Sequence, residues 1–267
     1  MAPAAQLSIL IPVFNERTLL PRLLKRVHAA LPDLRREIVI VDDCSADGTR
    51  EWLRTTFGED EAILVGFADG PDGEPEPILR GASERSVPTN SAPIVVRTVF
   101  HAQNQGKGAA LRTALQVASG EVLVIQDADL EYDPADLVPM WKLIADGHAD
   151  VVYGSRFYGR PHRCLNYHHF LANKLISTLF SVLYNQILSD LEVCYKMFRR
   201  EVCKVLTLRS NDFGFEIEFS ANVARQPNMR IYEVGVSYYG RSYAEGKKIN
   251  WRDGVKALWY IFRFRFT

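Results

Sequence analysis

The feature that most constrains the fold is a repeated alternation of short apolar runs and helical stretches, which continues through roughly Ala149. Each apolar run ends in polar or turn-forming residues, and the next segment carries apolar residues at helical spacing. Strands that alternate with helices in this way form βαβ units. The pattern therefore predicts an α/β fold with a mostly parallel sheet flanked by helices. The expected strands lie near residues 7–13, 37–42, 62–67, 94–100, 121–126 and 150–154.

Two aspartates stand directly after one of these apolar runs. Asp127 and Asp129 follow the run at residues 122–126. Ligands of open α/β sheets bind at the carboxyl ends of the strands. Mg²⁺ and Mn²⁺ prefer oxygen ligands, and they commonly take one or two carboxylates from the protein and further oxygens from substrate phosphates. The spacing therefore predicts a site for Mg²⁺ or Mn²⁺ that faces a diphosphate.

Polar segments close the other strands as well. The first strand ends in PVFNE (residues 12–16), the second in DDCSADGT (42–49), and NQGKG (104–108) precedes another helix. The last segment matches neither a Walker A loop nor a dinucleotide-binding G-x-G-x-x-G. We expect Gly106 and Gly108 to let the backbone pass close to a nucleotide at a helix N-terminus. Lys107 either adds positive charge there or is simply exposed.

These blocks resemble the family 2 glycosyltransferases with the GT-A fold, and in particular the dolichyl- or polyprenyl-phosphate mannose and glucose synthases. The resemblance continues in residues 150–157, 190–196 and 240–248. It implies a catalytic domain over residues 1–240, followed by a site-closing loop and a basic amphipathic helix over 241–267. Residues 69–93 are polar, rich in proline and glycine and without periodicity, so this insertion is expected to be an irregular surface loop.

The resemblance also implies how a nucleotide-sugar donor is held. Asp129 is the direct metal ligand, Asp127 lies closer to the ribose or to metal-bound water, and Glu131 also faces the metal. The nucleobase and ribose are contacted from the first two strand ends, by Pro12, Val13, Phe14, Glu16 and either Asp42 or Asp43. A carboxylate accepts from uracil N3–H and from guanine N1–H alike. UDP and GDP donors therefore both stay open.

The cations after residue 150 favour a phosphate acceptor. A phosphate monoester has a second pKa near 6, so it is already ionised and attacks without a general base. It needs cations that bring it up to a second anion. By resemblance, Arg156 and Arg163 meet a polyprenyl phosphate, Arg241 and Lys247 meet the donor diphosphate, and Lys196 is a further candidate. The expected reaction is a metal-dependent, inverting hexose transfer from UDP-glucose or GDP-mannose.

Asp190 and Glu192 leave a second acceptor class open. They lie where family 2 enzymes with hydroxyl acceptors place their base, whereas the matching aspartate of the polyprenyl-phosphate enzymes orients cations. A soluble or glycan hydroxyl needs such a base, because a hydroxyl is nearly inert at neutral pH. Glu216 is expected to pair with a site cation and Glu218 to be structural. A nucleotidyltransferase is less favoured, because no glycine-rich loop follows the first strand.

The C-terminal stretch has the composition of a helix at a membrane interface. Apolar residues recur at helical spacing from Trp251 to Phe266, interleaved with arginines and a lysine. Such a helix either binds a bilayer surface or packs on the domain with its basic face in water. Residues 167–188 predict a second helix with an apolar face, too polar to span a bilayer.

Bulk properties favour a cytoplasmic protein, at most peripheral on the cytoplasmic face of a membrane. The 32 basic and 32 acidic residues balance, so no global charge recruits nucleic acid. The four cysteines are scattered without a C-x-x-C pair, which argues against a zinc site or a disulfide framework. We expect no signal peptide, and no apolar run reaches the usual length of about 18 residues for a spanning helix.

Overall fold

The computed structural model describes residues 5–59, 61–70, 72–80, 92–159, 161–163, 167–241 and 251–266, with only the backbone for 251–253. Within it the chain forms two compact units. The N-terminal unit comprises residues 1–106 and 110–138, and the C-terminal unit comprises 107–109 and 139–267. A helix that starts at Lys107 therefore contributes its first residues to one unit and the rest to the other.

The N-terminal unit contains a mixed sheet with the strand order β4-β3-β5-β2-β1-β6. The central strands β5, β2, β1 and β6 are parallel, whereas β3 and β4 are antiparallel additions at one end. These strands are β1 (Leu7–Val13), β2 (Arg36–Asp42), β3 (Glu61–Asp69), β4 (Pro75–Leu79), β5 (Ile94–Phe100) and β6 (Val122–Ile125). The five strands predicted in this region are confirmed.

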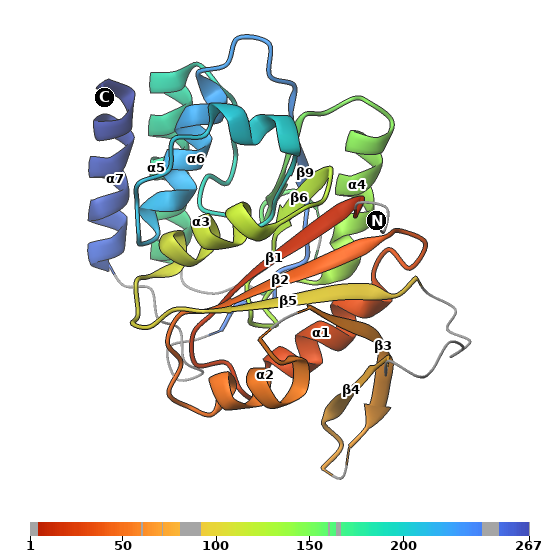
Figure 1. Cartoon of the computed structure of the whole chain (residues 1–267). Coiled ribbons are helices and arrows are strands. Elements are labelled where there is room, and N and C mark those ends of the chain that lie inside the picture. The colour runs from red at the N-terminus through yellow and green to blue at the C-terminus, as the bar shows by residue number, and fades with distance from the viewer. Residues whose placement is uncertain are drawn as a thin grey trace. The chain divides into compact units, whose positions relative to one another are not determined.

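Helices of the N-terminal unit follow the predicted alternation. α1 (Leu20–Ala29) and α2 (Thr49–Phe57) lie on the same side of the strands in Figure 1. α3 (Lys107–Val117) precedes β6, and the short helix η1 (Pro134–Asp136) leads into α4 (Leu137–Ala145), which belongs to the C-terminal unit from Pro139 on. β2 is buried along its whole length, as a near-continuous apolar run in a parallel sheet requires.

The insertion at residues 69–93 was expected to be an irregular loop, but part of it is a strand. Residues 75–79 form β4, which pairs antiparallel with β3 and places Pro77 opposite Phe67. Proline lacks an N–H, so it is tolerated in a strand only at an edge or a strand start. β4 is the last strand of the order, so Pro75 and Pro77 fit there. Residues 81–91 lie outside the described part of the chain.

The C-terminal unit is built on three strands in the order β8-β7-β9. β7 (Val151–Ser155) is antiparallel to β8 (Lys196–Arg199) and parallel to β9 (Ile231–Gly235). The helices are α5 (Tyr167–Tyr184), η2 (Arg200–Val205), α6 (Gly214–Ala224) and α7 (Trp251–Phe266). α7 packs against α5 and α6 (Figure 1), and Tyr184 donates a hydrogen bond to the carbonyl of Ile261 over 3.2 Å.

Both amphipathic helices of this unit present apolar side chains to solvent. In α5 the buried residues are Ile176, Ser177, Phe180 and Tyr184, so much of the predicted apolar face, including Leu171, Leu175 and Val182, is exposed instead. α7 buries Ala257, Ile261 and Phe264, while Val255, Trp259, Phe262 and Phe266 stay exposed. In the described part of the chain, no helix has the length and apolarity that a membrane crossing needs.

Candidate active site

The polar segments after β1 and β2 are fastened to each other. The Asn15 amide donates to the Ser45 hydroxyl over 2.9 Å, and the Ala46 amide donates to the Asn15 side chain over 2.8 Å. The Glu16 amide adds a bond of 3.1 Å to the Thr49 hydroxyl. β1 and β2 are parallel neighbours, so both segments leave the sheet at the same edge. The sequence motif therefore encodes a rigid double loop, a role that sequence reasoning missed.

The two predicted nucleoside-contacting aspartates are both buried. Asp42 accepts from Arg50 Nε over 2.7 Å and from the Ser45 amide over 3.3 Å. Asp43 accepts from the Gly106 amide over 2.7 Å and from the Gln105 amide over 2.9 Å. Neither carboxylate caps α2. Both carboxylates accept hydrogen bonds from the loops around them and so hold these loops in place.

His101 completes this arrangement and was not predicted as a site residue. Its Nδ1 lies 2.7 Å from Asp43 Oδ1, and its Nε2 lies 2.9 Å from the Thr113 hydroxyl. The imidazole thus links the end of β5 to β2 and to α3. A polar residue directly after an apolar strand is the signal that identifies the other site segments, and His101 carries the same signal.

The remaining residues predicted to contact the nucleoside differ in their exposure to solvent. The Val13 side chain is buried, and its carbonyl accepts from the Asp43 amide over 2.8 Å. Pro12 and Glu16 are half-buried, and Phe14 is exposed. Contact with a nucleoside through Val13 is therefore restricted to its backbone.

Asp127, Asp129 and Glu131 follow β6, the parallel neighbour of β1, so they leave the sheet at the same edge as residues 12–16. All three are half-buried, and the Glu131 amide donates to Asp129 Oδ1 over 3.1 Å. Their oxygens are the hard donors that Mg²⁺ and Mn²⁺ prefer. Among the described residues, no three His, Cys, Asp or Glu side chains form a ready metal cluster. The chemistry of these three carboxylates fits a hard divalent cation.

In the C-terminal unit, Arg156 and Asp190 form a buried pair. Arg156 Nε and Nη2 lie 2.7 and 2.6 Å from the two Asp190 oxygens, and the Arg156 amide adds a bond of 3.0 Å. Asp190 is fully buried, whereas the Arg156 side chain is 15% exposed. Both oxygens of Asp190 thus hold one guanidinium. The arrangement orients a cation.

Arg163 lies beside the segment that carries Arg241. Its amide donates to the Tyr238 carbonyl over 2.8 Å, and its Nη1 donates to the Gly240 carbonyl over 3.1 Å. The guanidinium of Arg156 lies 5.2 Å from the centre of the Tyr238 ring. Two of the predicted acceptor cations, Arg156 and Arg163, therefore contact the segment that leads to Arg241. Lys247 lies outside the described residues.

Two further lysines share one buried carboxylate. Lys196 is fully buried and forms an ion pair with Glu216. Lys107 Nζ lies 3.1 Å from the other Glu216 oxygen and 5.9 Å from the centre of the Phe213 ring. Glu216 thus pairs with two lysines that the sequence analysis named as candidate site cations. Lys196 is committed to this pair and has no exposed surface with which to meet an acceptor.

Glu218 and Gly108 have structural roles. Glu218 accepts from the amides of Arg209 and Ser210 over 2.9 and 2.8 Å, as expected of a structural carboxylate. Gly106 starts α3 with a positive φ of 94°, a conformation that glycine adopts without strain. Gly108 passes so close to the Ser210 carbonyl that a Cβ would collide with it. The close approach at Gly108 is thus to the protein's own backbone.

Glu192, one of the two candidate bases, has a pKa well above the ordinary value of a glutamate. Burial raises its pKa to about 7, with Arg156 opposing the shift and the carboxylates of Asp190 and Glu216 reinforcing it. Glu192 lines a small pocket together with Asp212, Phe213, Gly214, Ile217, Lys256, Ala257 and Tyr260. A carboxylate with a pKa near neutrality is suited to general acid–base chemistry.

Comparison with known proteins places this architecture in a family. The family model described as glycosyl transferase family 2 matches residues 8–70 and 68–207, so the chain belongs to glycosyl transferase family 2. The protein is thus a glycosyltransferase with a GT-A fold, and the predicted family and fold class are confirmed.

Two groups of proteins are similar over most of this chain. An undecaprenyl-phosphate mannosyltransferase of Micrococcus luteus is 28% identical over 89% of this chain and 85% of its own. An undecaprenyl-phosphate 4-deoxy-4-formamido-L-arabinose transferase of Aeromonas hydrophila is 26% identical over 90% of this chain, which spans only 62% of that protein. Glucosyl-3-phosphoglycerate synthase of Mycobacterium tuberculosis, solved with Mn²⁺, UDP and phosphoglyceric acid, matches with a TM-score of 0.65 at 15% identity over 98% of this chain and 78% of that chain.

Proposed function

We propose that the protein transfers a hexose from UDP-glucose or GDP-mannose to a polyprenyl phosphate, with inversion and with Mg²⁺ or Mn²⁺. The observation that carries the proposal is the buried Arg156–Asp190 pair. At the position where a hydroxyl acceptor would need a free base, this chain has an aspartate that holds a guanidinium. That is the requirement of an anionic acceptor, and the two similar undecaprenyl-phosphate transferases support the same acceptor class.

The reaction needs no proton transfer from the acceptor. An acceptor phosphate oxygen bonds to the anomeric carbon of the sugar while the bond from that carbon to the donor diphosphate breaks. The nucleoside diphosphate leaves with the electron pair. In this proposal Arg156 and Arg163 hold the acceptor phosphate, and Arg241 and Lys247 hold the donor diphosphate. Fixed cations of this kind counter the repulsion between two anions and stabilise the charge that develops on the leaving group.

The donor falls to residues at the strand ends of the N-terminal unit. Asp129, with Asp127 and Glu131, would hold the metal, which supplies charge neutralisation at the diphosphate when bound. Glu16 and the backbone of residues 12–14 would contact the nucleoside. Asp42 and Asp43 are buried in bonds to the protein, so we assign them mainly to loop positioning. Lys107 would face the donor from the start of α3.

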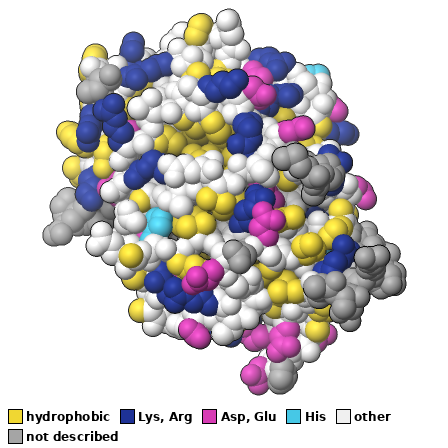
Figure 2. Space-filling model, in the orientation of Figure 1, with side chains coloured by type: hydrophobic (Ala, Val, Ile, Leu, Met, Phe, Trp, Pro, Cys, Tyr) yellow, Lys and Arg dark blue, Asp and Glu magenta, His cyan; other side chains and the backbone are white. Residues whose placement is uncertain are grey.

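A bilayer surface is the partner that best fits the exposed faces of α5 and α7. Val255, Trp259, Phe262 and Phe266 recur at i, i+4, i+7 and i+11 and are all exposed. Four cations and one acid occur among the 16 residues of α7. Figure 2 shows hydrophobic and basic side chains interleaved at the left edge, where α7 lies in Figure 1. Aromatic residues with cations favour the interface of an anionic membrane.

Vesicle sedimentation tests the membrane partner. The protein should pellet with phosphatidylglycerol vesicles and much less with phosphatidylcholine vesicles, and Trp259→Ser with Phe262→Ser should remove the binding. Tyr232→Ser, a change at an exposed aromatic of β9, is the matched control. A different result is that the wild-type protein binds neither vesicle and forms a dimer, while the double variant is monomeric. The exposed face of α7 would then be an interface between two copies of the chain.

Release of nucleoside diphosphate tests the reaction. UDP-glucose, GDP-mannose and UDP-GlcNAc would each be incubated with Mg²⁺ or Mn²⁺, with and without a short-chain polyprenyl phosphate. Release that requires the lipid phosphate and one donor would establish the proposal and name the sugar. Donor turnover indifferent to the lipid phosphate would overturn the acceptor.

A soluble or glycan hydroxyl acceptor is the second candidate, and the titration of Glu192 favours it. A carboxylate with a pKa of about 7 is half ionised at neutral pH and can take a proton from a hydroxyl. Under this alternative Glu192→Gln abolishes transfer to every acceptor. Under the polyprenyl-phosphate proposal the same variant retains most of its activity. A turnover assay of this single variant therefore separates the two.

A further inference from the structure

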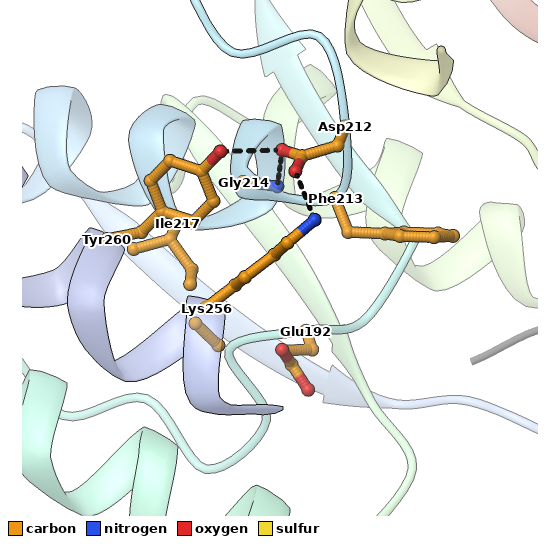
Figure 3. Close-up of a pocket in the computed structure, with 8 residues that line it drawn as sticks. Glu192, Asp212, Phe213, Gly214, Ile217, Lys256 and Tyr260 are labelled. Carbon is orange, nitrogen blue, oxygen red and sulfur yellow. Dashed lines mark hydrogen bonds and ion pairs between the residues drawn. The ribbon is translucent and has the colours of Figure 1, made fainter. Parts of the chain in front are cut away.

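The C-terminal helix is tied to the turn before α6 by a specific polar contact. Asp212 Oδ1 accepts from the Tyr260 hydroxyl over 2.9 Å and from the Gly214 amide over 3.0 Å. Lys256 Nζ lies 3.6 Å from the other Asp212 oxygen. Figure 3 shows Tyr260 and Lys256 converging on Asp212 from α7. Two residues one turn apart on α7 therefore hold one carboxylate.

The contact between Tyr260 and Asp212 depends on a glycine at position 214. A Cβ at position 214 would lie 2.5 Å from Cε2 of the Tyr260 ring, so only glycine lets the ring approach. Burial and the hydrogen bond to Asp212 raise the pKa of Tyr260 to about 12. The hydroxyl therefore stays a donor throughout the physiological pH range.

The same turn also grips the start of α3. The Gly108 amide, one of the helix-start amides that lack an intrahelical partner, donates to the Asn211 carbonyl over 2.8 Å. Lys107 lies over the Phe213 ring and pairs with Glu216. Residues 211–216 thus contact Lys107 and Gly108 at three points, while Asp212 in the middle of them is held by α7.

We propose that Tyr260 and Lys256, through Asp212, are positioning residues for Lys107. This inference rests on the proposed role of Lys107 at the donor. If the Asp212 contact is lost, the turn is no longer held from α7, so the Asn211 carbonyl that accepts from the Gly108 amide and the Phe213 ring beside Lys107 are less firmly placed. The helix that carries the proposed membrane face then also sets the affinity for the nucleotide.

Tyr260→Phe is the sharpest test, because it removes one hydroxyl and keeps the ring against Gly214. Titration calorimetry with UDP and with GDP in the presence of MnCl₂ should give an affinity about three- to tenfold weaker, the net effect of one ordinary hydrogen bond. Lys256→Met should act in the same direction. Tyr232→Phe, which also removes a tyrosine hydroxyl from this unit, should change nothing.

A double substitution shows whether the effect passes through Lys107. In a Lys107→Gln background, Tyr260→Phe should have little further effect, since residues that act through one another are not additive. If Tyr260→Phe weakened nucleotide binding equally in both backgrounds, the two changes would be additive and the proposal would be overturned. A general loss of structure in Tyr260→Phe would give this additive result.

Amide hydrogen exchange separates this inference from the donor assignment. Tyr260→Phe and Asp212→Asn should speed exchange in the segment 107–111, and Tyr232→Phe should not. Unchanged exchange in both variants would overturn the positioning role. A third outcome is faster exchange in Tyr260→Phe and Asp212→Asn together with wild-type affinity for UDP and GDP in Lys107→Gln. That result would leave the positioning role intact and remove Lys107 from the donor site.

Discussion

Three buried carboxylates, Asp43 of the N-terminal unit and Asp190 and Glu216 of the C-terminal unit, are held in opposite ways. Asp43 in the N-terminal unit is surrounded by two backbone amides and an imidazole. Asp190 in the C-terminal unit is clamped by a guanidinium, and Glu216 lies between two ammonium groups. Amide dipoles stabilise a carboxylate without cancelling its charge, whereas a paired cation cancels it.

This difference matches what each unit would have to bind. The strand ends of β2 and β6 gather aspartates at one edge of the N-terminal sheet, which suits a divalent cation and the nucleotide that comes with it. In the C-terminal unit Asp190 and Glu216 orient an arginine and two lysines, which suits an anionic partner. Substitutions of single side chains in each unit test this difference.

The largest effect is expected at the metal edge. Asp129→Ala should lower metal-dependent turnover by roughly 10³-fold, because a lost metal ligand removes several kcal/mol of transition-state stabilisation. The melting temperature should barely change. Steady-state assays across a range of MnCl₂ concentrations check this. Glu121→Gln, an exposed acid just before β6, is the matched control, and wild-type rates in Asp129→Ala would refute the metal assignment.

The next effect is expected at the buried pair. Asp190→Asn should cost about 3–5 kcal/mol of folding stability, because it leaves the Arg156 charge unpaired in a buried site. Thermal and urea unfolding measure it. Asp150→Asn is the control, since Asp150 makes a similar two-bond contact with Arg230, which is half exposed. Equal losses in the two variants would mean that burial of the Asp190 pair has no special consequence.

A smaller effect is expected at the amide-held carboxylate. His101→Phe removes one partner of Asp43 and should cost about 1.5–3 kcal/mol, the range for a hydrogen bond to a charged group. Part of the loss should appear as weaker UDP or GDP binding, because Asp43 also holds the Gln105 and Gly106 amides. Calorimetry and thermal unfolding check both. Thr113→Val, which removes only the neutral partner of His101, should do less.

The smallest effect concerns pH. Folding raises the pKa of Glu192 from 4.5 to about 7, so between those values the native state binds more protons than the unfolded state. The contribution of Glu192 to stability is thus full below pH 4.5 and is lost as the pH rises through 7. Glu192→Gln should melt a few degrees above wild type at pH 8 and level with it at pH 4.5. A higher melting point for wild type at pH 8 would reverse the assignment.

The parts of this molecule that sequence alone predicted are local ones. The strand positions follow from apolar runs that any parallel sheet must bury, and the segments at residues 12–16, 42–49 and 104–108 follow from polar groups placed at strand ends. The family motifs pointed to Arg156 and Asp190 as separate candidates, whereas Glu216 was expected to pair with a site cation. All of these signals lie within a few residues of the chain.

The parts that escaped prediction depend on partners far apart in sequence. His101 meets Asp43 across 58 residues, and Lys107 meets Glu216 through packing that no periodicity encodes. The apolar face of α5 is exposed because its neighbour α7 covers the opposite side, which a helical wheel cannot reveal. β4 was missed because prolines argue against a strand in general, and only its edge position removes that objection.

The edge position of β4 has a consequence for how the chain behaves among its own copies. An exposed edge strand offers unpaired amides and carbonyls to any other strand, which is a route to aggregation. Two of the five residues of β4, Pro75 and Pro77, have no amide to offer, and Glu76 between them adds a charge. The proline-rich insertion thus ends the sheet with a strand that resists further pairing, and it guards the solubility of the folded enzyme.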